Sequence, residues 1–162
     1  MLAAPEFQNF QRSNLLSSHT NTLVAALHTA RNEAIKRNEP TYLAPLSNSG
    51  WSSGWRVYVD TDFDGIYNEG VDVSLIEKSA LPTQLTLSKS GADAFVSFNG
   101  SGFPQKATPL NTTLTLQHAG FTPSSDLAAR NARRVMIAKT GRIRSCKPVA
   151  AVDGQCASSS ND

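Results

Sequence analysis

Basic side chains gather near the end of the chain, in a stretch that contains no acidic residue. The stretch lies between Asp126 and Asp153. Its basic residues are Arg130, Arg133, Arg134, Lys139, Arg142, Arg144 and Lys147. Arginine predominates, and its planar guanidinium group can bind a phosphate through two hydrogen bonds. The stretch therefore predicts a surface that binds a phosphate-rich polyanion. The alternative is a solvated basic surface that binds no partner.

The segment "KTGRIRSCKP" indicates how these side chains are arranged. Gly141 permits a backbone conformation or a close approach that other residues disfavour. If the chain continues extended beyond this glycine, Arg142 and Arg144 project in the same direction, about 7 Å apart. That separation is comparable with the spacing of phosphates along one DNA strand. Lys139 and Lys147 would extend the row.

Cys146 and Cys156 are the only cysteines and are near neighbours in the sequence. Such a pair is typical of a disulfide that closes a short loop in an oxidising compartment. A disulfide would restrain the tail and lower the entropic cost of presenting the arginines to a ligand. Two free thiols, or half of a metal site, are the alternatives. No histidine or further cysteine lies nearby to complete a zinc site.

The segment "DTDFDGIYNEGVD" contains a second candidate site. Alternate carboxylates followed by a glycine match the first half of a calcium-binding loop. These residues are Asp60, Asp62, Asp64 and Gly65. The second half departs from the pattern, because Val71 occupies the position of the bidentate Glu, with Glu69 and Asp72 on either side. A turn between two strands uses the same residue types for their backbone geometry alone, so we assign no metal from the sequence.

No local signature of catalysis is present in the sequence. It contains no nucleophile elbow, no phosphate-cradling glycine loop and no zinc signature with histidine. We therefore predict that the protein is not an enzyme and that it needs no cofactor. The net charge of +2 is too small to indicate a nucleic-acid binder by itself. Any such function must depend on the local distribution of charge.

A long amphipathic helix is predicted from Pro5 to Asn38. Apolar residues recur along it at three- and four-residue steps, with polar residues between them. The apolar positions are Leu16, Leu23, Leu27, Ala30, Ala34 and Ile35. Lys36 and Arg37 fall in the last turn, where they interact favourably with the helix dipole, and Pro40 stops the helix. Such a helix would span roughly 50 Å, so part of it should project from a small domain.

After the helix, short runs of alternating apolar and polar residues are separated by Gly, Pro, Asn or Ser. The runs are "TYLAPL", "WRVYVD", "VDVSLIEKS", "QLTLS", "AFVSFNG", "TLTLQH" and "RRVMIAKTG". They predict about six or seven antiparallel strands that pack with the helix in an α+β fold, with the helix segregated from the strands. The length of 162 residues suits one domain, divided into the helix (1–38), a β-rich head (39–145) and a C-terminal tail (146–162).

Three segments together resemble one protein family. They are "LVAALHTARNEAIKRNEP", "GWRVYVDTDFDG" and "RRVMIAKTGRIRSCKP". In this order they are similar to the soluble domain of type IV minor pilins and type II secretion pseudopilins of the FimT/GspH family. The resemblance covers the chain from Pro5 to Cys156. It implies a pilin-like fold, a subunit without enzymatic activity, and a head in the periplasm or on a pilus, which agrees with a disulfide.

Members of this family carry an N-terminal signal and an apolar half-helix that anchors them in the inner membrane before assembly. The sequence contains neither, so the resemblance implies that it starts where the amphipathic half of the pilin helix begins. In the full-length protein the expected partners are the inner membrane, through the missing segment, and other major and minor pilins, through the helix. The head is expected in the periplasm before assembly and on the pilus afterwards.

The FimT branch of the family acts in natural transformation and resembles this chain in a GRxR motif, which contributes to binding of double-stranded DNA. The motif stands here as Gly141, Arg142, Ile143 and Arg144. The resemblance therefore implies DNA binding without sequence preference by Arg142 and Arg144, and charge and position extend that expectation to Lys139 and Lys147. The alternative is a purely structural minor pilin or secretion pseudopilin, in which the same arginines contact another subunit.

Overall fold

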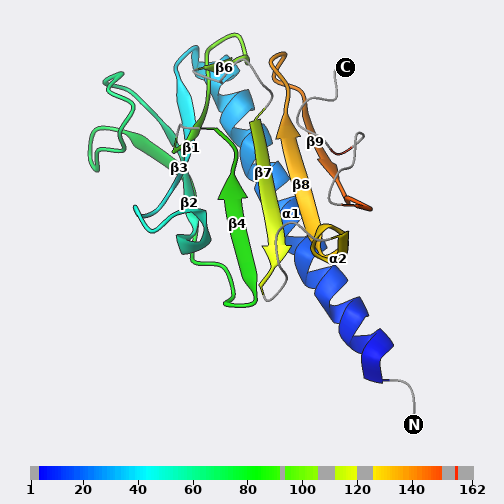
Figure 1. The fold of residues 1–162 in the computed structure, drawn as a ribbon. Coiled ribbons are helices and arrows are strands. Elements are labelled where there is room, and N and C mark those ends of the chain that lie inside the picture. Colours follow the sequence, from blue (N-terminus) through cyan, green and yellow to red (C-terminus); the bar gives the residue numbers. More distant parts are fainter. Residues whose placement is uncertain (1–3, 92–93, 106–111, 120–125, 151–155, 157–162) are drawn as a thin grey trace.

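A long N-terminal helix packs against two antiparallel sheets in the computed structural model (Figure 1). Residues 4–91, 94–105, 112–119, 126–150 and 156 are described. The elements are α1 (Ala4–Arg37), β1 (Thr41–Pro45), the 3-10 helix η1 (Trp51–Ser53), β2 (Trp55–Val59), β3 (Val73–Lys78), β4 (Leu85–Lys89), β5 (Val96–Phe98), β6 (Pro104–Gln105), β7 (Thr112–His118), α2 (Asp126–Arg130), β8 (Ala132–Ile137) and β9 (Ile143–Cys146). The predicted α+β fold is confirmed.

One side of α1 is buried along most of its length. The buried positions follow one another at three- and four-residue steps, as the sequence pattern predicts. They are Leu16, Thr20, Leu23, Leu27, Ala30 and Ala34, and Ala26 beside Leu27 is buried as well. Ile35 was expected on this side and is instead 47% exposed. One residue along a helix turns by about 100°, so Ile35 lies at the edge of the buried side, where its side chain is close to Gly102 in the loop between β5 and β6.

The two ends of α1 have different surroundings. At its C-terminal end, Glu33 forms ion pairs with Lys36 and Arg37, and Asn38 ends the helix with a positive φ of 55°. At the other end, the helix extends beyond the sheets, as its length predicted (Figure 1). Phe7 and Phe10 are 61% and 63% exposed there. No helix among the described residues combines the length and apolar character needed to cross a membrane.

The two sheets form one hydrophobic core with α1. Their strand orders are β3-β2-β1-β5-β6 and β4-β7-β8-β9. Helix α1 contacts β1, β2 and β5 of the first sheet and β7, β8 and β9 of the second. Completely buried side chains from both sheets, such as Trp55 and Phe98 in one and Leu114 in the other, belong to the same cluster. The helix therefore joins the two sheets into one domain.

The structure adds elements that the sequence pattern did not predict. The described part of the chain contains nine strands in two sheets, whereas six or seven strands were expected. Strand β6 has two residues and β9 four, which is too short for a clear alternation of apolar and polar residues. Helix α2 lies between β7 and β8, so the helices are not segregated from the strands. The boundary between head and tail after residue 145 falls within β9.

Replacing Leu27 by Ala tests the packing of α1 on the sheets. Leu27 is completely buried in the core cluster. We expect Leu27→Ala to lower the free energy of unfolding by about 2–5 kcal/mol, because the substitution removes buried methyl groups and leaves a cavity. Urea denaturation measures the loss. The neighbouring His28 is exposed, so His28→Ala is the matched control and should cost less than about 0.5 kcal/mol. Equal losses in the two variants would contradict this packing.

Candidate nucleic-acid interface

The GRxR segment forms one side of a tight hairpin between β8 and β9. Ile137 pairs with Ile143 at the end of the ladder. Beyond this pair, the Ala138 N–H donates to the Arg142 carbonyl (2.9 Å) and the Gly141 N–H donates to the Ala138 carbonyl (2.8 Å). Gly141 has a φ of +79°. A three-residue hairpin loop commonly needs this left-handed conformation at its last residue, which explains the glycine of the motif.

The pairing of β8 with β9 decides which side chains face away from α1. Val135 and Ile137 belong to the core cluster, and Ile143 packs against it. Residues directly opposite each other in a ladder share a face. Arg144 pairs with Met136, so both lie on the face opposite to α1. Arg142 continues this alternation beyond the ladder and is exposed, as is Lys139 in the loop. The same alternation, continued beyond the ladder, would give Arg142 and Arg144 the common direction that the sequence predicts.

Gly141 also holds the hairpin against the rest of the molecule. It is buried, and a Cβ atom placed on it would clash with the Gly102 carbonyl oxygen and approach the Arg31 guanidinium to 3.0 Å. Arg31 in turn donates from Nε to the same Gly102 carbonyl (3.0 Å). The hairpin, the loop that contains Gly102 and helix α1 therefore meet at one point. The position of the basic loop relative to α1 is fixed by this contact.

The predicted disulfide between Cys146 and Cys156 is present, with a Cα–Cα distance of 5.9 Å. Cys146 pairs with Arg134 in the ladder, so it lies on the face opposite to α1. Arg134 donates from Nη1 to the Cys156 carbonyl (2.9 Å). The half-cystine at position 156 is thereby attached to β8 as well as to β9. These bonds restrain the strand that carries Arg144.

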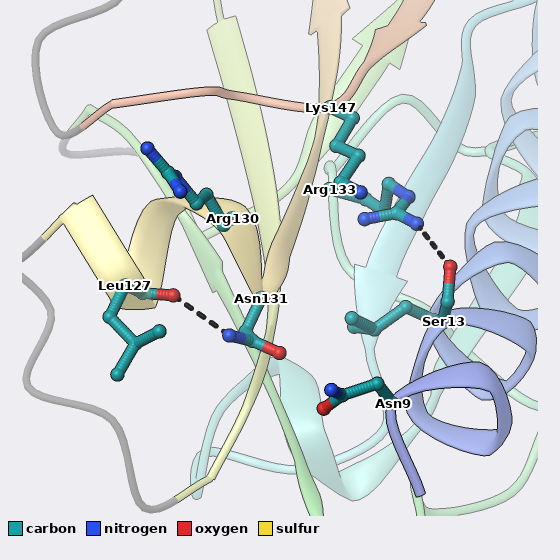
Figure 2. A pocket seen from close by; sticks show the side chains of 8 residues that line it. Asn9, Ser13, Leu127, Arg130, Asn131, Arg133 and Lys147 are labelled. Carbon is teal, nitrogen blue, oxygen red and sulfur yellow. Dashed lines mark hydrogen bonds between the residues drawn. The ribbon is translucent and has the colours of Figure 1, made fainter. Parts of the chain in front are cut away.

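Other basic residues of the stretch lie on the opposite side of the same sheet, in a pocket of about 260 Å³ beside α1 (Figure 2). The pocket is lined by Asn9, Ser13, Leu16, Leu127, Arg130, Asn131, Arg133 and Lys147, none of which is acidic. Arg133 donates to the Ser13 hydroxyl (3.0 Å) and to the Ala132 carbonyl (2.9 Å). Burial lowers the pKa of Arg133. Lys147 therefore lies with Arg133 and does not extend the row of Arg142 and Arg144.

The spacing of the residues in the sequence could have shown that Lys147 lies on a different side of the strand from Arg142 and Arg144. Arg142 and Arg144 are two positions apart and Lys147 is three positions from Arg144, and successive residues of a strand point to opposite faces, so an odd separation places two side chains on opposite sides. The pocket residue Arg130 and the outward-facing Arg134 were counted as charge but not assigned to a site. The acidic residues Asp60, Asp62 and Asp64 lie in the loop between β2 and β3 of the other sheet.

The fold is shared with known pilins and pseudopilins. The type IV minor pilin FimU of Pseudomonas aeruginosa matches with a TM-score of 0.61 at 21% identity, over 86% of this chain and 98% of FimU. The minor pseudopilin EpsH of the type 2 secretion system of Vibrio cholerae matches with a TM-score of 0.56 at 14% identity, over 82% of this chain and 96% of EpsH. The protein is thus of the pilin-like class, in which a long N-terminal helix packs on antiparallel sheets.

The sequence identifies the family within this class. Residues 19–141 match the family described as type II transport protein GspH, which covers most of the chain. The chain belongs to the GspH family and is a minor pilin or pseudopilin, a structural subunit and not an enzyme. Curated protein sequences give no significant match. The match to the GspH family ends at Gly141, so it does not include Arg142 and Arg144.

Replacing Gly141 by Ala tests whether the hairpin is held against Gly102. A left-handed conformation alone costs a residue with a Cβ atom about 1–2 kcal/mol. Gly70 has a similar φ of +84° with no atom near the added Cβ, so Gly70→Ala measures this cost alone. We expect Gly141→Ala to lower the free energy of unfolding further, because its Cβ also clashes with the Gly102 carbonyl. Chemical denaturation of both variants measures the difference, and equal losses would contradict the close contact.

Proposed function

We propose that this protein is a minor pilin of a type IV pilus that binds double-stranded DNA without sequence preference through the β8–β9 hairpin. Its role would be DNA uptake for natural transformation. One observation carries the proposal: Lys139 and Arg142 are exposed at a hairpin end that carries Arg144 on the same outward face. This end of the hairpin lies far from the N-terminus of α1 (Figure 1). DNA can reach it without displacing subunits that pack along the projecting half of the helix.

The binding would depend on the phosphate backbone. Lysine and arginine neutralise phosphates and release counterions, so affinity falls steeply with salt and does not depend on base sequence. Three cations make few contacts, so one head should bind weakly. Several copies in one filament would strengthen binding through avidity. The disulfide and the contact at Gly141 support the proposal, since a restrained hairpin loses less conformational freedom when it binds.

A purely structural role, in a pilus or in a type II secretion filament, is the second candidate. The pocket with Arg130, Arg133 and Lys147 supports it, because the pocket adjoins the part of α1 near the exposed Phe7 and Phe10. Exposed aromatic side chains on a helix are typical of a surface that another protein covers. In this role, the pocket would receive an acidic side chain of a neighbouring pilin. The two candidates therefore assign different functions to the two sides of the second sheet.

A DNA titration tests the first candidate. We expect the wild-type protein to bind a short duplex of arbitrary sequence at low salt and more weakly at physiological salt. Arg142→Gln with Arg144→Gln should reduce the slope of log affinity against log salt by about 0.9 for each lost contact. Fluorescence anisotropy measures the binding, and circular dichroism shows whether each variant is folded.

The matched control is Arg130→Gln with Lys147→Gln, which removes the same charge from the pocket side. This variant should keep most of the binding. An equal loss in both double variants would mean that overall charge, and not the hairpin, attracts the duplex. If the wild-type protein binds no DNA at low salt, the proposal is wrong and the structural role becomes the better explanation.

The same variants test the second candidate in cells. We expect Arg130→Gln with Lys147→Gln to reduce the amount of assembled pili or of secreted protein, because the pocket would lose its attraction for a neighbouring subunit. Arg142→Gln with Arg144→Gln should leave assembly near the wild-type level. Counting surface pili, or assaying secretion, measures the effect. Normal assembly in the pocket variant would exclude the pocket as an essential subunit contact.

A further inference from the structure

The loop between β2 and β3 brings together three carboxylates that are up to twelve positions apart in the sequence. The carboxylate oxygens of Asp60, Asp62 and Asp72 lie within 4.8 Å of one another. Asp60 directly follows β2, and Asp72 directly precedes β3. In the sequence, Asp72 stands one position after the residue that closes a calcium-binding loop. In the folded loop, Asp72 nevertheless lies beside Asp60 and Asp62, so it can take the place of the glutamate that the sequence pattern lacks.

Asp60 is the unusual member of the cluster. Its side chain is completely buried, with 0% exposure. One carboxylate oxygen, Oδ2, accepts a hydrogen bond from the Gly65 N–H (3.0 Å). The other, Oδ1, is buried without a hydrogen-bond partner among the described residues. A buried carboxylate oxygen without a partner is destabilising, and a bound cation would supply the missing partner.

The groups around Asp60 favour the binding of a cation. The carboxylates of Asp62 and Asp72 lie within 4.8 Å of that of Asp60, and like charges this close repel one another. A dication among the carboxylates would offset this repulsion and the cost of burying Asp60.

The remaining bonds of the loop hold the carboxylates in place. Asp72 accepts from the Thr61 N–H (2.9 Å) through Oδ1 and from the Asn68 N–H (2.8 Å) through Oδ2. The Asn68 amide donates to Asp62 Oδ2 (3.2 Å). The Asp60 N–H donates to the Pro40 carbonyl (3.0 Å), which fixes the start of the loop next to β1. The three ligands are therefore arranged by the loop before any ion binds.

We propose that the loop binds one calcium ion through Asp60, Asp62 and Asp72. The ligands are all oxygens, which suits a hard cation, and a loop of this kind can add backbone carbonyls to reach the six to eight ligands that calcium prefers. Magnesium needs nearly ideal octahedral geometry and keeps much of its water, so a buried carboxylate in a pre-formed loop favours calcium. The ion would fix the β2–β3 loop to the end of the first sheet. This site is independent of the basic hairpin, which lies in the second sheet.

Isothermal titration of the chelator-treated protein with calcium chloride tests the proposal. We expect one ion per chain, with a dissociation constant of about 10⁻⁴–10⁻³ M, the range of extracellular calcium modules. The melting temperature should rise with calcium concentration, since the ion binds only the folded state. Asp72→Asn should weaken binding at least about tenfold, because each carboxylate adds to the affinity for a hard cation.

Glu69→Gln is the matched control, because Glu69 is an exposed acid of the same loop outside the cluster. It should bind calcium like the wild type. If Asp72→Asn does not fold, the exposed Asp62 serves instead, and Asp62→Asn must weaken binding. No heat and no change in melting temperature at about 10 mM calcium, a concentration above the expected range, would overturn the proposal. An equal response to magnesium would overturn the assignment to calcium.

Discussion

The packing of one side of α1 against both sheets is the contact on which the rest of the structure depends. The sheets share no strand in the described part of the chain, and α1 contacts three strands in each. Most of the stability of a helix in a protein comes from packing of its apolar side, and a sheet likewise needs one face covered. Leu23 and Leu27 are almost completely buried in this contact. Its loss would expose the helix and both sheets to water at once.

The same contact determines where the charges of β8 and β9 lie. The core takes Val135, Ile137 and Ile143 on the side of α1, so the alternate positions must point outward. Arg144 faces outward for this reason, and a shift of β9 by one residue would turn it toward the helix. Gly141 then fixes the end of the hairpin, because only a residue without Cβ fits against Gly102. Core packing therefore divides the basic residues into two groups.

Patterns within short segments explain what could be predicted from the sequence. The periodicity of α1 and the alternation in seven of the strands are local, and two neighbouring cysteines indicated a disulfide that the structure confirms. The division into two sheets depends on pairings between distant segments, such as Leu43 with Val96, which no local pattern contains. The spacing of Lys147 from Arg144 already indicated opposite sides, but that the side of Lys147 is the one beside α1 depended on knowing which face of the sheet is buried. The position of Asp72 beside Asp60 depended on the closure of a loop.

Although the net charge is only +2, the chain has one cluster of basic residues and one of acidic residues. The fold places the basic hairpin in the second sheet and the acidic loop in the first. At physiological salt, exposed charges farther apart than about 8 Å are largely screened from each other. A DNA strand at the hairpin would therefore respond mainly to Lys139, Arg142 and Arg144, and little to the acidic loop of the other sheet. In the proposed pilus role, the projecting part of α1 would pack among other subunits, and the hairpin at the other end of the helix would stay accessible to a polyanion.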